Sequence, residues 1–431
     1  MKNFKIFQMA FAALLVFMGV TATSCEDEPH KYEIADGVPT IKYVKVTSPE
    51  SGDSLITGAY MDNLICIVGD NLRSTVELWF NDQKAVLNTS YMTDNTILVA
   101  VPGNIPGEVS NMMYFVTASN DTITYPFEVI VPAPSVNSMS CEYAPAGSEA
   151  TIYGNYFIDD PNVPLSIAFG NVDVTEITDI QMSQVSFIVP QGVEECNVSV
   201  TSIYGTTVSS FHYLDTRNIL FDWDGSHGGI TSGHGWRNGV VQSTNPEGID
   251  GSYIYFGGVS MSGAVGGTWA EDNFSFNYWP EPENGYPELS SMPEFAEMLD
   301  RYELSELQIK FEAYVPTSNP WQSSALQMIF SGNDIVTYAT GNNGYFSNTD
   351  LPRGLWIPWQ LTGSYDTGDQ WVTVSMNLSE FNRTHEGQAC GSALSKDDFT
   401  GLTFFVWNGG VEGTDCNPVI CIDNIRIVPI N

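Results

Sequence analysis

The sequence predicts an all-β protein made of two small tandem β-sandwiches followed by a larger jelly-roll β-sandwich. Short runs of β-branched and aromatic residues alternate with polar residues and are separated by Gly, Pro and Asn, which is typical of strands and turns. The order of these runs repeats once between residues 39 and 216. From residue 217 onward, eight or so longer runs follow, and the last is expected to pair beside the first, as in a jelly roll.

Composition narrows the classes of partner. The 431 residues leave room for two to four domains, and 15 Lys and Arg against 51 Asp and Glu give a formal net charge of −36. Nucleic acid binding requires clustered basic side chains, and the sequence has no such cluster. Polyanionic glycans are disfavoured for the same reason, so a neutral glycan suits this surface better.

The first 25 residues are predicted to be an export signal that ends in a lipid anchor. Lys2 and Lys5 precede an apolar run over residues 6–20, which is too short to span a bilayer. Residues 21–25 (TATSC) resemble the cleavage box of bacterial lipoproteins, although Ala22 stands where that family favours Leu. The resemblance implies that Cys25 carries the lipid, including palmitate. Residues 26–28 (EDE) resemble the signal that sends Bacteroidetes lipoproteins to the cell surface, and residues 26–38 are expected to form a linker.

Residues 39–131 and 132–216 are predicted to be two copies of one β-module. The matching segments are residues 65–72 with 150–157, 76–81 with 165–170, and 97–102 with 185–190. Gly69 and Gly154 are expected to permit a tight turn, and Pro102 and Pro190 to end a strand. This order resembles the IPT/TIG family of immunoglobulin-like domains. Neither copy carries a cluster of candidate catalytic or metal-binding residues, so a rigid spacer is the expected role.

Residues 217–431 contain nine of the ten tryptophans, and several of these lie in Gly/Asn/Pro-rich segments that read as loops. Exposed aromatic surface is costly unless it faces a ligand, and a flat ring can stack on the apolar face of a sugar. Trp223, Trp371 and Trp407 lie in or next to strands and are expected mainly in the core. Trp356 and Trp359 could belong to either class. A helix is expected over residues 292–302.

The candidate carbohydrate-binding residues are therefore the aromatics of the loops together with a nearby guanidinium: Trp236, Trp269, Tyr278, Trp279, Trp321 and Arg237. Stacking tolerates many sugars, so polar side chains must read the hydroxyl groups. The polar side chains nearest in sequence are those of Arg237, Asn238, Glu271, Asp272 and Asn277.

The segments that carry a resemblance to a known family are ILFDWDG at 219–225, HGWRNG at 234–239, YIYFGG at 253–258, QWVTVSMNLSEF at 370–381 and CIDNIRIV at 421–428. With the anchor and the two spacers, they resemble the type-B surface glycan-binding proteins of Bacteroidetes. The resemblance implies a non-catalytic protein, without cofactor, held at the outer membrane by its lipid. It also implies binding of a neutral β-glucan (xyloglucan, mixed-linkage glucan or laminarin) beside a TonB-dependent importer.

Other classes stay open from the sequence alone. A glycoside hydrolase would need two facing carboxylates, and Asp222, Asp224, Glu271 and Asp272 lie near the candidate aromatics. An adhesin for host protein fits the same architecture. His227 and His234 match no zinc motif, and no residues specify a calcium site. A disulfide between Cys390 and Cys416 is an additional option.

Overall fold

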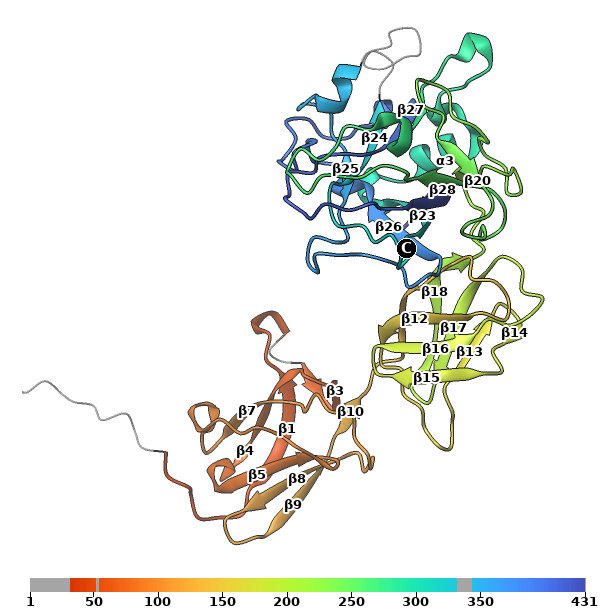
Figure 1. The fold of residues 1–431 in the computed structure, drawn as a ribbon. Coiled ribbons are helices and arrows are strands. Elements are labelled where there is room, and N and C mark those ends of the chain that lie inside the picture. The colour runs from red at the N-terminus through yellow and green to blue at the C-terminus, as the bar shows by residue number, and fades with distance from the viewer. Residues whose placement is uncertain (1–31, 52–53, 332–342, 431) are drawn as a thin grey trace, which may run out of the picture. The chain divides into compact units, whose positions relative to one another are not determined.

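The structure is a computed structural model that describes residues 32–51, 54–331 and 343–430. Its regular secondary structure consists mainly of strands, which Figure 1 shows in chain order. The chain divides into two compact units, residues 1–132 and 133–431. The predicted export signal and Cys25 lie outside the described residues. Within the described ranges, every helix is too short or too polar to cross a membrane.

The first unit contains two four-stranded antiparallel sheets, β2-β1-β4-β7 and β6-β5-β8-β9, and a short parallel pair of β3 with β10. Alternate residues of the strands are buried, as in β8, which is the pattern of a sheet with one face on a core. The strands are β1 (Thr40–Val46), β2 (Leu55–Ile56), β3 (Gly58–Tyr60), β4 (Leu64–Asp70), β5 (Thr75–Phe80), β6 (Gln83–Lys84), β7 (Thr96–Ala100), β8 (Met112–Thr117), β9 (Thr122–Pro126) and β10 (Glu128–Ile130).

The second unit begins with a module of the same design, which we call the second module (residues 133–216). Its sheets are β11-β12-β16-β15 and β14-β13-β17-β18. The order β11-β12-β16 repeats β1-β4-β7, and the second sheet repeats β6-β5-β8-β9, so the predicted repeat reappears in these seven strands. The remaining edge strands differ, because β2 pairs with β1 whereas β15 pairs with β16. One core joins buried residues of both sheets. The strands are β11 (Ser135–Met139), β12 (Glu149–Asn155), β13 (Ser166–Phe169), β14 (Val172–Asp173), β15 (Ile177–Gln181), β16 (Gln184–Ile188), β17 (Cys196–Ser202) and β18 (Gly205–Tyr213).

The repeated glycines do not form the predicted turns. Gly69 and Gly154 lie inside β4 and β12, opposite the points where β1 and β11 shift register. A Cβ at Gly69 would lie 2.1 Å from the carbonyl oxygen of Thr40, and one at Gly154 would lie 1.8 Å from that of Ser135. Both positions therefore require glycine because the bulged neighbouring strand approaches the backbone too closely for a side chain.

The rest of the second unit, which we call the C-terminal domain (residues 217–430), has a larger sheet, β20-β21-β28-β23-β26, with β19 also paired to β28, and a four-stranded sheet, β22-β27-β24-β25. The expected pairing of the last strand with the first is confirmed, and α3 falls where a helix was predicted. The elements are β19 (Ile219–Phe221), β20 (Val240–Gln242), β21 (Tyr253–Phe256), α2 (Glu271–Phe274), β22 (Ser275–Tyr278), α3 (Pro293–Arg301), β23 (Leu307–Tyr314), β24 (Leu326–Ser331), β25 (Gly354–Trp356), β26 (Val372–Asn377), β27 (Gly401–Val406) and β28 (Ile420–Pro429).

A buried group of four charged side chains, which we call the junction cluster, joins the second module to the C-terminal domain. Glu142 of the second module contacts Lys310 of β23 at 2.5 Å and Arg426 of β28 at 2.7 Å. Arg426 also pairs with Glu312 at 2.8 Å. Burial alone would lower the pKa of Arg426, but Glu312 and Glu142 raise it well above its usual value. Burial likewise raises the pKa of Glu312 to about 7, although Arg426 lowers it, so the cluster favours the charge on Arg426 but not the charge on Glu312.

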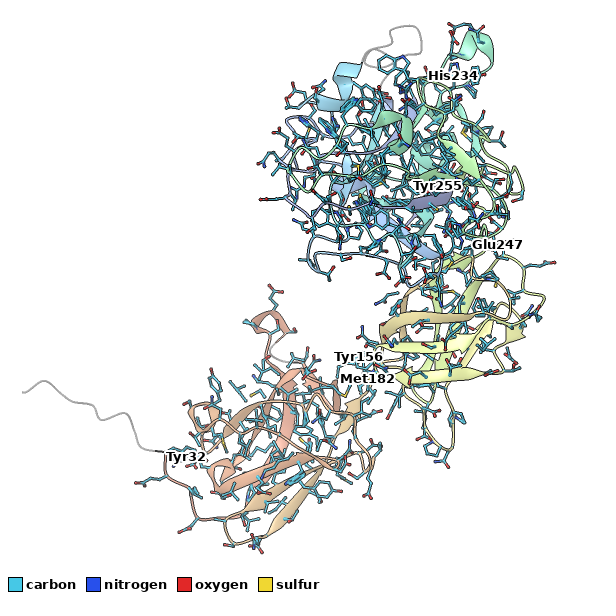
Figure 2. All side chains as sticks on the ribbon, viewed as in Figure 1. Tyr32, Tyr156, Met182, His234, Glu247 and Tyr255 are labelled. Carbon is cyan, nitrogen blue, oxygen red and sulfur yellow. The ribbon has the colours of Figure 1, made fainter. Side chains whose placement is uncertain are left out.

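Backbone contacts surround the junction cluster. The amide of Glu142 donates to the hydroxyl of Thr373 at 2.6 Å, and the amide of Thr373 donates to the carbonyl of Ser140 at 2.9 Å. Trp371, expected mainly in the core, is partly buried and packs on the core of the second module. Its indole N–H donates to the carbonyl of Glu247 at 3.0 Å, and Figure 2 shows Glu247 at this junction.

Cys390 and Cys416 are free thiols. The Cys390 thiol donates to the carbonyl of Thr349, while Cys416 lies 3.3 Å from the hydroxyl of Ser323. The two sulfurs thus have separate surroundings, and the suggested disulfide between them is wrong for this structure.

Candidate glycan-binding face

The four-stranded sheet β22-β27-β24-β25 is covered on both faces. Its inner face contributes Phe276, Met328 and Phe404 to the main core of the C-terminal domain. Because side chains alternate along a strand, the neighbouring residues point to the opposite face. There Ile329 and Phe405 join a second, smaller core. This second core is completed by Trp279, Tyr345, Phe346 and Leu351, and Trp236 and Trp407 pack against it.

Three tryptophans on this outer face keep ring surface open to solvent. Trp269 is 44% exposed and meets Phe346, Phe405 and Trp407 edge-on, with centroid distances of 5.0–5.5 Å. Trp236 is partly exposed and lies 5.2 Å from the buried ring of Trp279. Trp407 is also partly exposed. We call Trp236, Trp269 and Trp407 the aromatic platform.

The loop that carries Trp236 is fixed to β22 by hydrogen bonds. Asn277 accepts the amide of Arg237 at 3.0 Å through its side chain and the amide of His234 at 2.9 Å through its backbone carbonyl. A Cβ at Gly233 would lie 2.8 Å from the same carbonyl, so this close approach requires glycine. Figure 2 shows His234 at the end of the C-terminal domain remote from the second module. The Trp236 side of the platform therefore lies near that end.

Arg237 joins the loops of Trp236 and Trp269. Its guanidinium pairs with Glu271 at 3.3 Å and also contacts Asp272, two acids that follow closely after Trp269. One guanidinium nitrogen donates to the carbonyl of Trp236 at 2.9 Å. Arg237 thus lies at the platform, where much of its donor capacity holds the two loops together.

A buried arginine supports the segment that covers the second core. Arg353 donates to the side-chain oxygen of Gln327 at 2.8 Å and to the carbonyls of Phe346 and Asn348 at 2.5 and 3.0 Å. Burial lowers its pKa to about 10, so the group stays charged at neutral pH. The backbone carbonyls solvate this charge and thereby hold the Tyr345–Phe346 segment against the platform.

His385 stacks on Trp407 at one edge of the platform. The two rings are parallel within 2° and their centroids are 5.3 Å apart. Burial, followed by the charge of Arg353, lowers the pKa of His385. His385 is only 8% exposed, so its ring supports Trp407 and offers little surface of its own.

Three predicted contact residues do not face solvent. Trp279 and Trp321 are completely buried and Tyr278 is 1% exposed. Tyr278 points into the main core, and its hydroxyl donates to the carbonyl of Pro287 at 2.7 Å. Trp279 lies beneath Trp236, and Trp321 packs on Trp356. The prediction that these rings face a ligand was wrong, because loop composition indicates a connection but not which side of it meets the core.

Trp407 and the buried His385 lie at this candidate site but were not among the predicted residues. Trp407 follows a strand whose residues are all buried, so an assignment to the core was reasonable. The available signal was that β27 is apolar on both faces, which indicates cover on both sides. A tryptophan just past the end of such a strand lies at the edge of the segments that cover the sheet, where its ring can be partly exposed.

The acids and histidines weighed from the sequence have structural partners, and Glu271 and Asp272 pair with Arg237 as described above. Asp222 is buried and accepts the backbone amides of Gly225 and His227. His227 pairs with Asp250 at 2.9 Å, and His234 lies 2.7 Å from the carbonyl of Trp279. One group with metal-ligand spacing occurs in the described ranges, Glu195, His212 and Asp215, but Arg217 already binds both oxygens of Asp215 at 2.8 Å.

Known proteins match this chain over its length. Residues 213–429 match the family model described as the surface glycan-binding protein B xyloglucan binding domain. The crystal structure of surface glycan-binding protein PbSGBP-B from Prevotella bryantii is 36% identical, with a TM-score of 0.76 over 92% of this chain and 100% of that chain. An IPT/TIG domain-containing protein from Bacteroides ovatus is 27% identical over 44% of this chain, and the match spans 41% of that relative's length.

The family model covers the domain that bears the aromatic platform, and the P. bryantii protein is similar through both units. Proteins of this family are surface glycan-binding proteins and not enzymes. The chain belongs to the surface glycan-binding protein B family.

Proposed function

We propose that this protein captures a neutral β-glucan on the aromatic platform at the cell surface and passes it to an outer-membrane importer. The observation that carries the proposal is the set of three partly exposed tryptophans on one sheet face, each held by packing or hydrogen bonds. Rings that are already fixed before the ligand binds lose little conformational freedom when a sugar stacks on them. The net charge of −36 repels anionic polysaccharides, which favours a neutral glycan as the ligand.

Xyloglucan is the first glycan to test, since the matching family model is described as a xyloglucan binding domain. Mixed-linkage glucan and laminarin are the other candidates. In affinity gel electrophoresis, we expect xyloglucan to retard the purified protein and a polyuronate to leave it unretarded. A control protein without glycan affinity corrects for the viscosity of each gel. Equal retardation by all the polysaccharides, or by none, would contradict the proposal.

We propose further that residues 39–131 and 132–216 are IPT/TIG spacers, that residues 217–431 form a jelly roll, and that Cys25 bears the lipid. The repeated sheet order supports the spacers, and residues 21–28 support the anchor. In cells fed labelled palmitate, the full chain should take up label and Cys25→Ala should not. If the variant is labelled like the parent, the anchor lies elsewhere.

A further inference from the structure

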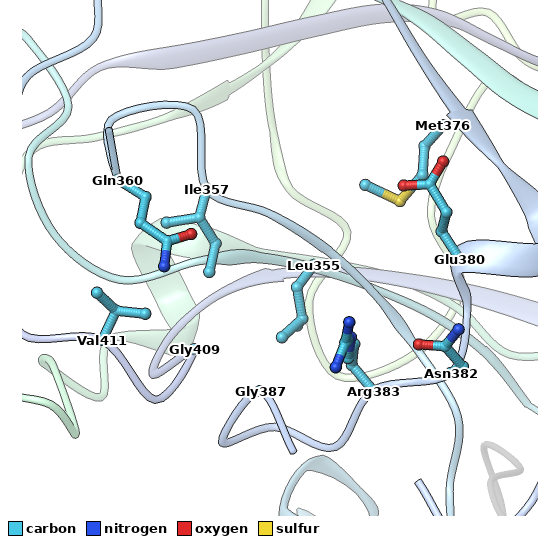
Figure 3. Close-up of a pocket in the computed structure, with 10 residues that line it drawn as sticks. All are labelled: Leu355, Ile357, Gln360, Met376, Glu380, Asn382, Arg383, Gly387, Gly409 and Val411. Carbon is cyan, nitrogen blue, oxygen red and sulfur yellow. The ribbon is translucent and has the colours of Figure 1, made fainter. Parts of the chain in front are cut away.

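A polar pocket opens beside the platform, at the edge of the sheet formed by β25. Its volume is about 480 Å³, which is in the range of small-ligand sites. Figure 3 shows Gln360 on one side, Asn382 and Arg383 on the other, and the apolar side chain of Leu355 between them. A hydrophobic floor between hydrogen-bonding walls is the arrangement that binds a sugar ring with its hydroxyls directed outward.

The polar groups of the pocket have spare hydrogen-bonding capacity. The backbone of Arg383 is fixed by two hydrogen bonds to Arg353, at 3.1 and 3.2 Å. Its guanidinium, however, makes no ion pair or hydrogen bond with any residue that the structure describes, although the protein has more than three acids for each base. Asn382 uses its side-chain N–H₂ for the carbonyl of Ser379 at 3.0 Å, which leaves its oxygen available.

The pocket lies next to the Trp407 end of the platform. Gly409, which lines the pocket, follows the platform residue Trp407 by two residues, and Gly387, which also lines it, follows His385 by two residues. The ring of His385 stacks on that of Trp407. Two residues span at most about 7 Å. The amide of Gly409 donates to the carbonyl of His385 at 2.9 Å, so the two loops are joined where ring and pocket meet. A glycan lying on Trp407 would therefore pass the mouth of the pocket.

We infer that this pocket receives a neutral branch sugar of the glycan whose main chain stacks on the platform, an inference that rests on the proposed function. A linear β-glucan has nothing to place there, whereas a glucan with single-sugar branches does. Arg383 and Gln360 would donate to the hydroxyls or ring oxygen of the branch, and the oxygen of Asn382 would accept. The carboxylate of Glu380, also on the pocket wall, disfavours an anionic branch.

The test compares a branched with an unbranched ligand. Isothermal titration would use a xyloglucan oligosaccharide and a mixed-linkage glucan oligosaccharide of equal backbone length, with the full mature chain. We expect Arg383→Met to weaken binding of the branched ligand about tenfold, which is the scale of a lost hydrogen bond to a charged group. Binding of the unbranched ligand should be unchanged. Arg301→Met, at an exposed arginine of α3, is the matched control and should alter neither.

The outcomes separate this inference from the proposed function. If Trp269→Ala removes binding of both ligands while Arg383→Met changes neither, the platform stands and the branch pocket is wrong. Equal losses for both ligands in Arg383→Met would place the main chain in the pocket and also overturn the inference, as would a parent protein that binds only the unbranched ligand. If Trp269→Ala binds as the parent does, the platform itself is wrong. Gln360→Ala provides a second variant on the opposite wall, with the same expected preference.

Discussion

Trp269→Ala should abolish retardation in xyloglucan gels and weaken binding at least thirtyfold. The ring is 44% exposed and lies between Phe346 and Trp407, so it is the most open face of the platform. Truncating a central aromatic anchor of a binding site costs on the order of 2–4 kcal/mol, which corresponds to about thirtyfold or more. Isothermal titration against the oligosaccharide gives the size of the loss.

The matched control is Trp79→Ala in the first unit. It also removes a partly buried tryptophan, but one far from the platform in sequence, and this variant should bind the oligosaccharide as the parent does. Both variants should keep the circular dichroism spectrum of the parent. Trp279→Ala is a different case, because this ring is fully buried and its loss should destabilise the fold by about 3–5 kcal/mol. Binding by Trp269→Ala within twofold of the parent would rule out the platform.

Glu142→Ala should lower the free energy of unfolding by about 3–5 kcal/mol, the usual cost of breaking a buried ion pair from one side. The carboxylate of Glu142 is the group that joins Lys310 and Arg426 across the junction cluster. Without it, Lys310 stays buried with no charged partner among the described residues, and Arg426 keeps only Glu312. Urea unfolding followed by tryptophan fluorescence measures the change, and Trp371 at this junction supplies a local signal.

Glu176→Ala, at an exposed acid of the second module, is the control and should change stability by less than about 0.5 kcal/mol. The double variant Glu142→Ala with Lys310→Met should recover part of the loss, because it removes the uncompensated charge. An unfolding curve for Glu142→Ala that overlays the parent's would show that the junction cluster contributes nothing to stability.

Much of the architecture could be predicted because the signals are local. Alternating residues, glycines and prolines mark strands and turns, and the repeat in sequence reappears as a repeat in sheet order. The tight-turn role predicted for Gly69 and Gly154 failed because a bulge depends on the neighbouring strand, which a local pattern does not include. The junction cluster was not predicted either, since its four residues lie up to 284 positions apart.

The candidate binding face was predicted in part, for the same reason. Loop composition found Trp236 and Trp269, which are solvent-accessible, and Arg237, which joins their loops. It equally selected Trp279 and Trp321, which are buried. Composition reports that a ring lies in a connection, whereas exposure depends on what other segments cover it. The segment around Tyr345 and Phe346, placed by Arg353, is such a cover and has no marker in the sequence.

The location of the junction cluster has a consequence for how the protein works in changing salt. Exposed ion pairs weaken as ionic strength rises, but counter-ions cannot approach charges that are removed from water. Lys310, Glu312, Arg426 and Glu142 are each at most 5% exposed at the side chain. The attachment between the C-terminal domain and the second module should therefore be insensitive to ionic strength. Interactions of the strongly acidic protein surface, in contrast, should weaken as the salt concentration rises.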